Sequence, residues 1–323
     1  MVMVLFNEAF EDLGTIHLDI DFEIGDVNSL NDFELTSSGI DAHGIYIPGT
    51  EWGGVFEYQQ GQTRSDSQTI KGWNWRGLLT QGIIEPPAGS DYRIVSGEAN
   101  NIIRELLESF LGGFFVVTET DSGLTINSYQ FKLHTTFLEG LMDMLSEYGY
   151  RLKIYAQKTG TGGKIQVFLE AVPAVILEGE YNEDNGLDLI FTESQMGINH
   201  LICLGKGELQ NRQRIDLYLQ EDGSIGKDKY FDGFSERTAV YENSSAESLT
   251  DLEKYGQTRL KEISCKRSLD MKNVELEEEM EIGDIVSGRH RASGITIQKP
   301  IIKKILRVSD GIASIEYAVK GEG

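Results

Sequence analysis

The sequence contains little cysteine and histidine, which limits the chemistry that it can support. Cys203 and Cys265 are its only cysteines among 323 residues, and its five histidines are scattered along the chain. Two cysteines provide neither a disulfide framework nor a four-cysteine zinc site, so we predict two reduced thiols in a core. Neither Gly-x-Ser-x-Gly nor His-Glu-x-x-His occurs. We therefore predict no catalytic residue, no metal site and no cofactor.

Long hydrophobic runs are also absent. A membrane-spanning helix needs about 20 consecutive apolar residues, and no stretch of the sequence approaches that length. The apolar run over residues 2–6 is too short for a secretory signal before Glu8 interrupts it. We expect no membrane insertion, and we expect synthesis and folding in the cytoplasm. At 40% hydrophobic and 25% charged residues, the chain is globular and long enough for two or three cores.

Basic residues are scarce, above all near the N-terminus. The net charge is −23, no Lys or Arg precedes Arg64, and residues 1–90 contain 14 acids and 3 bases. Nucleic-acid binding through phosphate contacts needs a basic surface, so we predict no stable nucleic-acid binding. An acidic surface serves solubility, or it lets a polyanion pass without being held. Both interpretations stay open at this point.

Strand patterns dominate the N-terminal third. Apolar side chains alternate with polar ones at Ile16, Leu18, Ile20 and Phe22. Further strand-like runs, separated by turn-forming residues, cover residues 39–47, 54–60 and 68–76. We predict a first small antiparallel β-barrel over residues 1–90. Pro86, Pro87 and Pro173 mark the joints that follow, because proline does not fit a central strand.

Between these prolines the apolar period changes to that of helices. One apolar face runs over residues 99–111, behind a cap at Ser96 and before Gly112 and Gly113; a second runs over 137–148, behind Thr136 and before Gly149. Strands over 150–156 and 164–172 follow, joined by a glycine turn. We predict an inserted α+β domain over residues 91–174, with its helices packed on its own strands.

Strands return over residues 187–194, 199–207 and 212–220, and one helix follows near 246–264, capped by Ser245 or Ser248. The last fifty residues form an antiparallel meander, in which residues 313–319 alternate between apolar and polar and Asp310-Gly311 supplies a turn. A meander cannot bury its apolar face alone, so earlier strands must meet it. We predict a second β-barrel over 175–323, completed by this meander, with strand exchange between the barrels around 174–210.

Several motifs resemble known sites but lack a required part. Residues 158–164 are rich in glycine, but a phosphate loop also needs a hydroxyl at Ile165 and a following helix, so we predict a hairpin turn. His200 and Cys203 have metal-like spacing, yet strand alternation directs them to opposite faces. Residues 182–186 lack the ligand spacing of a calcium loop and indicate a turn. Residues 277–279, three glutamates, are typical of a solvated edge.

The tryptophans form a sharper feature. Trp73 and Trp75 are predicted to share a strand face, Arg76 follows them, and Trp52 is the only other tryptophan. Large aromatic side chains beside arginine often anchor interfaces. Trp52, Trp73, Trp75 and Arg76 are therefore a candidate interface, with packing in a core as the equal alternative.

The order of these segments resembles a known family, the hub proteins at the distal end of bacteriophage tails and tail-like bacteriocin particles. Five matching segments carry the resemblance: residues 31–35 (Asn-Asp-Phe-Glu-Leu), 72–79 (Gly-Trp-Asn-Trp-Arg-Gly-Leu-Leu) with Ile83 and Ile84, the helix from Gly97, 199–207 (Asn-His-Leu-Ile-Cys-Leu-Gly-Lys-Gly) and 282–286 (Ile-Gly-Asp-Ile-Val). The resemblance implies an α+β, mainly β fold: two tail-tube-like antiparallel β-barrels with an inserted small α+β domain.

The resemblance also implies a function. Such hubs form homotrimers with pseudo-sixfold symmetry, joining a tail tube or distal tail protein to a tip spike or fibre around an axial channel. We therefore expect a non-enzymatic structural hub, made in the bacterial cytoplasm and assembled into a virion tail or tail-like particle. The chain ends soon after its last strand, so we expect no C-terminal peptidoglycan hydrolase. Two alternatives stay open: a cell-wall-degrading glycosidase of the tail tip, and a host-receptor-binding module.

Overall fold

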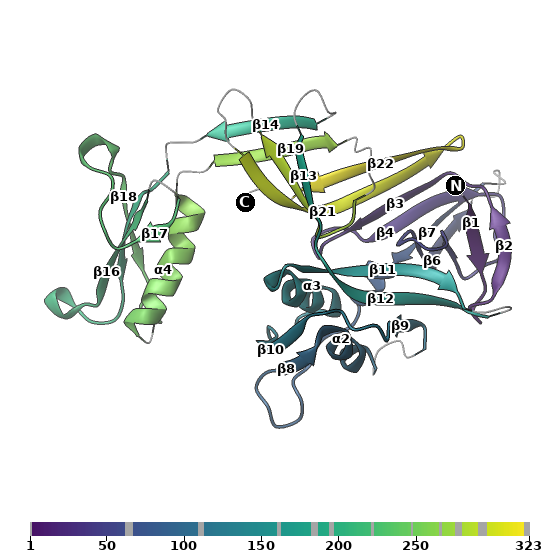
Figure 1. The fold of residues 1–323 in the computed structure, drawn as a ribbon, viewed down its shortest axis with the longest axis horizontal. Coiled ribbons are helices and arrows are strands. Elements are labelled where there is room, and N and C mark those ends of the chain that lie inside the picture. Colours follow the sequence, from purple (N-terminus) through teal and green to yellow (C-terminus); the bar gives the residue numbers. More distant parts are fainter. Residues whose placement is uncertain are drawn as a thin grey trace. The chain divides into compact units, whose positions relative to one another are not determined.

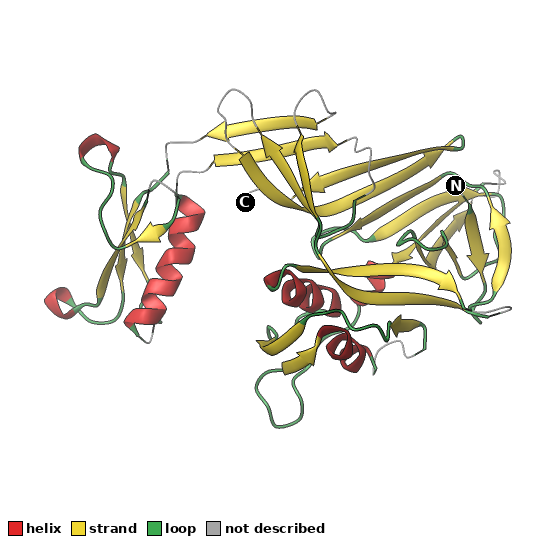
Figure 2. Cartoon of the chain, in the orientation of Figure 1, coloured by secondary structure: helices red, strands yellow, loops and turns green. Residues whose placement is uncertain are grey.

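The computed structural model describes residues 2–61, 67–108, 113–159, 163–181, 187–193, 197–220, 223–246, 248–264, 267–274, 280–289 and 296–319. Strands predominate, with a few helices (Figure 2), which confirms the predicted mainly β class. The chain divides into two units: Met1–Asp188 with Met271–Lys320, and Leu189–Asp270 with Gly321–Gly323. The domain ranges 1–90, 91–174 and 175–323 stay a prediction, as does the closure of each barrel. The calcium-like segment 182–186 and the glutamates 277–279 lie outside the described residues.

An eleven-stranded sheet forms the framework of the larger unit (Figure 1). Its strands follow the order β13-β20-β21-β3-β4-β7-β6-β5-β1-β2, and β22 pairs with β21 off this path. The strands are β1 (Met3–Phe6), β2 (Asp12–Ile16), β3 (Ile20–Gly25), β4 (Asp32–Ser37), β5 (Gly44–Tyr46), β6 (Gly53–Gly61), β7 (Gln68–Asn74), β13 (Ile176–Tyr181), β20 (Ile285–Arg289), β21 (Thr296–Ser309) and β22 (Ile312–Val319).

The C-terminal meander joins the N-terminal strands. β21 and β22 form the predicted hairpin, turned by Asp310 and Gly311, which both have positive φ. β21 then pairs antiparallel with β3, with Leu306 opposite Phe22. The prediction that earlier strands meet the meander is thus confirmed, and the strand that pairs with β21 belongs to the N-terminal third. Complementary charge favours the observed partner, because Arg307 lies 3.2 Å from Asp21 and Lys303 lies 3.6 Å from Glu23.

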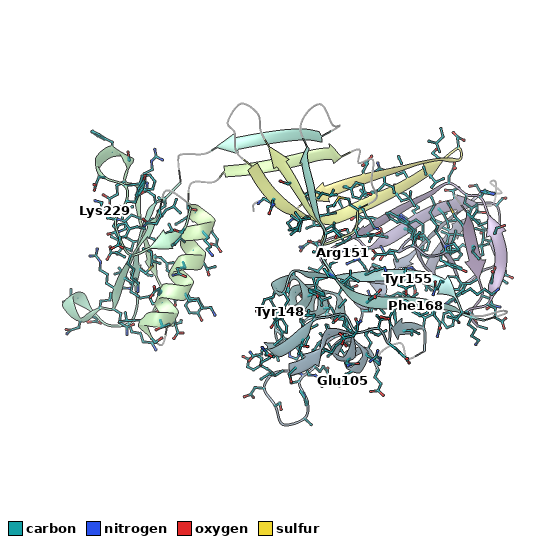
Figure 3. All side chains as sticks on the ribbon, in the orientation of Figure 1. Glu105, Tyr148, Arg151, Tyr155, Phe168 and Lys229 are labelled. Atoms are coloured by element: carbon teal, nitrogen blue, oxygen red, sulfur yellow. The ribbon has the colours of Figure 1, made fainter. Side chains whose placement is uncertain are left out.

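The segment between the prolines has the predicted helices and hairpin. α3 (Phe137–Glu147) begins behind Thr136, whose hydroxyl accepts the Glu139 N–H at 3.1 Å. The structure describes α2 as Ala99–Leu107, and residues 109–111 of the predicted helix lie outside the described residues. The cap of α2 is Glu98 rather than Ser96, because the longer Glu98 side chain accepts two N–H groups of the first turn. β11 (Tyr150–Lys158) and β12 (Ile165–Pro173) confirm the hairpin across the glycine turn. Tyr155 and Phe168 stack across its strands, 5.2 Å between ring centroids (Figure 3).

These helices pack on nearby strands but share a wider core. α3 contacts β11, while α2 contacts β12, β8 (Ile94–Glu98) and β9 (Phe115–Val117); β8 pairs with β10 (Thr125–Gln130), and β9 pairs with β12. The helices therefore pack on strands of their own segment, as predicted. Their buried side chains nevertheless belong to one cluster with Phe6, Tyr46 and Trp75. Residues 91–174 are consequently stabilised by the N-terminal strands as well as by their own.

The smaller unit is a four-stranded sheet with one helix. Its strands lie in the order β17 (Ile225–Gly226), β16 (Arg214–Leu219), β15 (His200–Leu204) and β18 (Thr238–Glu242). α4 (Leu249–Ile263) covers one face through Leu252 and Leu260, behind the Ser248 cap, one of the two predicted caps. β14 (Leu187–Glu193) and β19 (Arg267–Val274), where the chain passes from one unit to the other, pair with each other.

Cys203 is a buried free thiol, as predicted, and burial raises its pKa to about 11. Cys265 lies outside the described residues. The thiol also explains a glycine in α4, since a Cβ on Gly256 would lie 2.4 Å from the Cys203 sulfur. Among the described residues, no helix is long and apolar enough to cross a membrane.

Candidate assembly interface

The structure buries most of the predicted tryptophan interface. Trp52, Trp75 and Arg76 are at most 2% exposed, and only Trp73 reaches the surface, at 36%. The prediction that Trp73 and Trp75 share a strand face is wrong, because β7 ends at Asn74 and α1 (Trp75–Leu79) begins at Trp75. The change to a helix turns the Trp75 and Arg76 side chains into the interior. Core packing, the alternative interpretation, is what the structure shows for these three residues.

Two of the segments that carried the resemblance meet at the start of α1. Asn74 caps the helix, and its side-chain oxygen accepts the Gly77 N–H at 2.9 Å. The Asn74 backbone N–H donates to the Asn31 carbonyl at 3.1 Å. A Cβ on Gly77 would lie 2.3 Å from that same carbonyl oxygen. Residues 31–35 and 72–79 therefore pack closely against each other, and they can do so because residue 77 is glycine.

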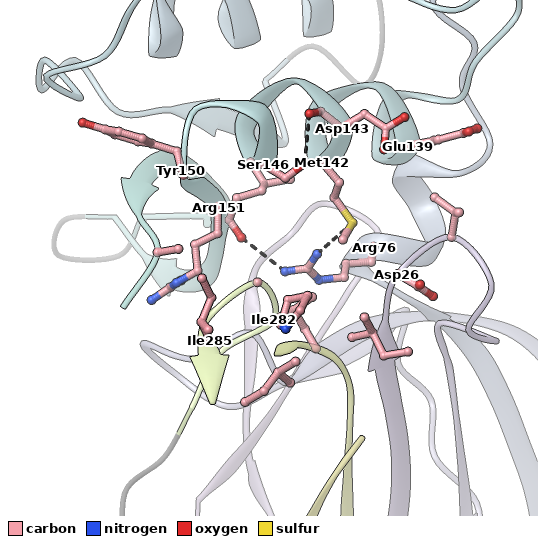
Figure 4. Close-up of a pocket in the computed structure, with 18 of the residues that line it drawn as sticks. Asp26, Arg76, Glu139, Met142, Asp143, Ser146, Tyr150, Arg151, Ile282 and Ile285 are labelled. Atoms are coloured by element: carbon pink, nitrogen blue, oxygen red, sulfur yellow. Dashed lines mark hydrogen bonds between the residues drawn. The ribbon is translucent and has the colours of Figure 1, made fainter. Parts of the chain in front are cut away.

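Arg76 is held in the interior by an acid and by the hairpin β11–β12. Its Nε lies 2.5 Å from Glu51 Oε1, and both side chains are at most 2% exposed. Its Nη2 donates to the Leu152 carbonyl at 3.2 Å, and its Nη1 lies 3.5 Å from the Met142 sulfur (Figure 4). A buried guanidinium needs such partners, because an unpaired charge in the interior is strongly unfavourable. The pair fixes α1 against β11 and α3.

Lys304 of β21 brings the C-terminal strands to the same charge cluster. Its ammonium lies 2.5 Å from Glu281 and 3.9 Å from Glu51, and its side chain is 1% exposed. It also lies 4.7 Å from the centroid of the Trp52 ring, in cation–π contact. Arg76, Glu51, Lys304 and Glu281 thus form a cluster of two cations and two anions without net charge.

The turn before β20 contains another of the matching segments, residues 282–286. Asp284 is 4% exposed; its Oδ1 lies 2.6 Å from Arg151 Nε and accepts the Val175 N–H at 2.9 Å. Gly283 has a φ of +96°, and a Cβ there would lie 2.8 Å from the Arg151 Cβ. Gly283 therefore lets this turn approach β11, and Asp284 forms an ion pair with Arg151 of that strand.

A pocket of about 370 Å³ lies beside these charges (Figure 4). Its floor consists of buried residues, among them Arg76, Leu152, Ile282 and Ile301. Its rim includes the exposed residues Val27, Asn28 and Ser146 and the half-buried acids Asp26, Glu139 and Asp143. Arg76, the charged residue of the floor, is paired with Glu51, and the other floor residues named here are apolar.

The fourth matching segment lies in the smaller unit. His200 and Cys203 point to opposite faces of β15, as predicted: Cys203 packs under α4, and the His200 ring stacks on Tyr218. His200 Nε2 lies 2.9 Å from Asp216, and Nδ1 lies 2.9 Å from Glu236. The hydrogen bond from Arg214 lowers the pKa of Asp216, and the one from Lys229 lowers the pKa of Glu236. No three described His, Cys, Asp or Glu side chains are grouped as metal ligands would be.

Sequence reasoning missed Glu51, Lys304 and Asp284. One signal for Lys304 was present: it shares its strand face with Leu306 and Val308, both buried. A lysine on the apolar face of a strand indicates a buried cation, which requires an acid. Which acid it meets cannot be deduced from alternation, because Glu51 and Glu281 lie far from it in the sequence.

Comparison with known proteins shows which of them share this fold. No protein-family profile matches the chain, and no curated protein sequence matches it. Solved structures do. The prophage tail protein gp18 of Listeria monocytogenes EGD-e is 13% identical, with a TM-score of 0.53 over 100% of this chain and 95% of its own. The 43 kDa tail protein of prophage MuSo2 from Shewanella oneidensis is 14% identical, with a TM-score of 0.52 over 99% and 98%.

A chain in the structure of the phage P2 baseplate in its activated conformation is 10% identical, with a TM-score of 0.53 over 99% of this chain and 98% of its own. At such identities the likeness concerns the fold. The chain has the fold of phage tail and baseplate proteins, which confirms the resemblance seen in the sequence.

Proposed function

We propose that this chain is a structural component of a phage tail or tail-like particle, and that it acts there as a homotrimeric hub. The hub joins the hexameric tail tube, or a distal tail protein, to the tip spike or fibre around an axial channel. The observation that supports the proposal is the extent of the likeness, which covers 99–100% of this chain and 95–98% of each tail or baseplate chain compared.

Symmetry gives the proposal a mechanism. Two strand-rich parts per chain, repeated in three chains, present six similar faces to a hexameric tube, while the trimer presents threefold symmetry to a spike. The net charge of −23 suits a surface along which DNA passes without being held. The paired charges of Arg76, Glu51, Lys304 and Glu281 suit a rigid framework rather than a catalytic site, because no acid or base among them is left without a partner.

A reconstruction of the particle that contains this chain tests the proposal. We expect three copies in one ring, in contact with the tube on one side and with the tip on the other. Any other copy number contradicts the hub. A second assay tests the absence of catalysis: purified chain is incubated with host peptidoglycan, and release of soluble fragments contradicts a purely structural role.

A further inference from the structure

Loop 227–237 of the smaller unit, between β17 and β18, presents an aromatic side chain to solvent. Phe234 is fully exposed, on the three-residue 3₁₀ turn Gly233–Ser235. Tyr230 in the same loop is also exposed, and its ring packs edge-on against Phe231 at 4.9 Å. An exposed phenylalanine gains nothing from its own fold, because none of its apolar surface leaves water.

The loop is held in one conformation. Asn199, directly before β15, makes two hydrogen bonds to the loop backbone. Its side-chain amide donates to the Ser235 carbonyl at 2.6 Å, and its side-chain oxygen accepts the Arg237 N–H at 2.8 Å. Lys229 (labelled in Figure 3) lies 2.7 Å from Glu236 and 3.0 Å from Asp232. A preorganised loop loses little entropy on binding, so an apolar tip on it is suited to docking.

We propose that Phe234 of one chain docks in the pocket of Figure 4 on a second copy of this chain. The pocket, at about 370 Å³, has room for a phenyl ring, and Leu152, Ile282 and Ile301 give it an apolar floor. A contact between two different surfaces of identical chains is heterologous, and it closes a ring if the rotation between copies allows. The inference rests on the proposed trimer and names the contact that forms it.

Charge supports the same pairing. Arg237, three residues from Phe234, is exposed and has no acidic partner among the described residues. Asp26 on the pocket rim has no basic partner among them; its carboxylate accepts the Asn28 N–H and the Ser29 hydroxyl instead. Glu139 and Asp143 nearby share a single cation, Lys132, at 3.2 and 2.7 Å, so these three rim acids outnumber the cation paired with them. Arg237 of loop 227–237 therefore meets charge of opposite sign at Asp26.

Disulfide trapping between two full-length variants tests the contact directly. One chain carries Ser235→Cys, on the exposed residue next to Phe234, and the other carries Ser146→Cys on the pocket rim, so both chains keep the Phe234 ring. Mixing them under mild oxidation is expected to give an interchain disulfide between positions 235 and 146, identified by peptide mass spectrometry. Neither variant alone gives this bond. A mixture that contains trimer by mass but no such disulfide overturns the contact and leaves the trimer intact.

Association measurements provide a second readout. Phe234→Ser is expected to weaken self-association at least about tenfold, as loss of a central aromatic anchor does. Leu209→Ser is the matched control, because Leu209 is 94% exposed on the other short 3₁₀ turn of the same unit. Equal association of the two variants overturns the proposal. A wild-type chain that stays monomeric at its highest soluble concentration also overturns the proposed contact. The proposed hub function is tested separately, by the particle reconstruction.

A mixing experiment distinguishes this contact from a symmetric one. Ser146→Trp fills the pocket but keeps the loop, and Phe234→Ser keeps the pocket but loses the anchor. A mixture of these two variants has one intact contact per pair, so it is expected to form dimers that cannot close into a ring. Trimers in this mixture overturn the proposal.

Discussion

Arg76 and Glu51 form an ion pair inside the larger unit, with 2.5 Å between Nε and Oε1 and exposures of 1% and 2%. The pair joins the first helix of the chain to the turn before β6, and Lys304 extends it to the C-terminal strands. Through Lys304, these charges connect segments that lie more than two hundred residues apart in the sequence. The tryptophan motif around Arg76 does not predict this connection.

Removing one partner of this pair should be costly. Glu51→Ala leaves Arg76 without its acid and is expected to lower the free energy of unfolding by about 3–5 kcal/mol, measured by denaturant titration. Lys71→Ala breaks the Glu34–Lys71 pair, whose side chains are each 50% exposed, and should change stability by about 0–1 kcal/mol. Similar losses in the two variants would show that the buried pair contributes no more than a surface one.

Gly283 is expected to tolerate no side chain. Gly283→Ala introduces a Cβ at 2.8 Å from the Arg151 Cβ, on a residue with φ of +96°. Gly311→Ala is the control, since φ is +78° there but nothing lies within 4 Å of the added Cβ. Both variants should lose stability through backbone strain, and Gly283→Ala should lose about 1–3 kcal/mol more because of the overpacking. Equal losses would mean that the turn shifts away from β11 without penalty.

Leu106→Asp should unfold more than the segment that contains it. Leu106 is 6% exposed in the core cluster that also includes Phe6 and Trp75, and an unpaired buried carboxylate is strongly unfavourable. We expect the larger unit to lose its cooperative melting transition, which calorimetry measures. Glu105→Ala, on the exposed side of the same helix, should melt like the wild type. Retained cooperative melting of Leu106→Asp would contradict the shared core.

Glu98 makes the start of α2 sensitive to acid. Burial opposes its ionisation, but hydrogen bonds from Ser122, Asn100 and Asn101 outweigh that effect and lower its pKa below 4.5. Because the folded pKa lies below the unfolded one, the stabilisation is complete above the unfolded pKa and is lost as the pH falls through the folded pKa. Glu98→Gln should therefore reduce the loss of stability below pH 4.5, measured by denaturant titration across pH. An unchanged pH profile would contradict this role.

The acids of residues 1–90 provide a test of the proposed channel. Some are paired, as Asp21 is with Arg307, but Glu8, Asp41 and Glu57 are exposed. Where such an acid faces the lumen, substitution by Lys is expected to slow DNA ejection from a DNA-carrying particle, with stronger slowing at low salt. Ejection rates unchanged by all three substitutions at low salt would indicate that these acids face outward and serve solubility.

The sequence by itself determined the features that depend on neighbouring residues. The helix at Phe137–Glu147 with its Thr136 cap, the Ser248 cap of α4, the hairpin around residues 158–164 and the turn at Asp310-Gly311 all follow from hydrogen bonds and apolar periods within a few residues. The opposite faces of His200 and Cys203 follow in the same way from strand alternation.

Only the tertiary structure decided which strands pair and which charges are buried. Alternation marks the apolar face of β21 but does not select β3 as its partner, because that choice depends on complementary surfaces far apart in the chain. The same holds for Trp75 and Arg76. Their spacing fits a strand and a helix turn equally well, and Asn31, Asn74 and Glu51 favour the helix only once the fold has brought them together.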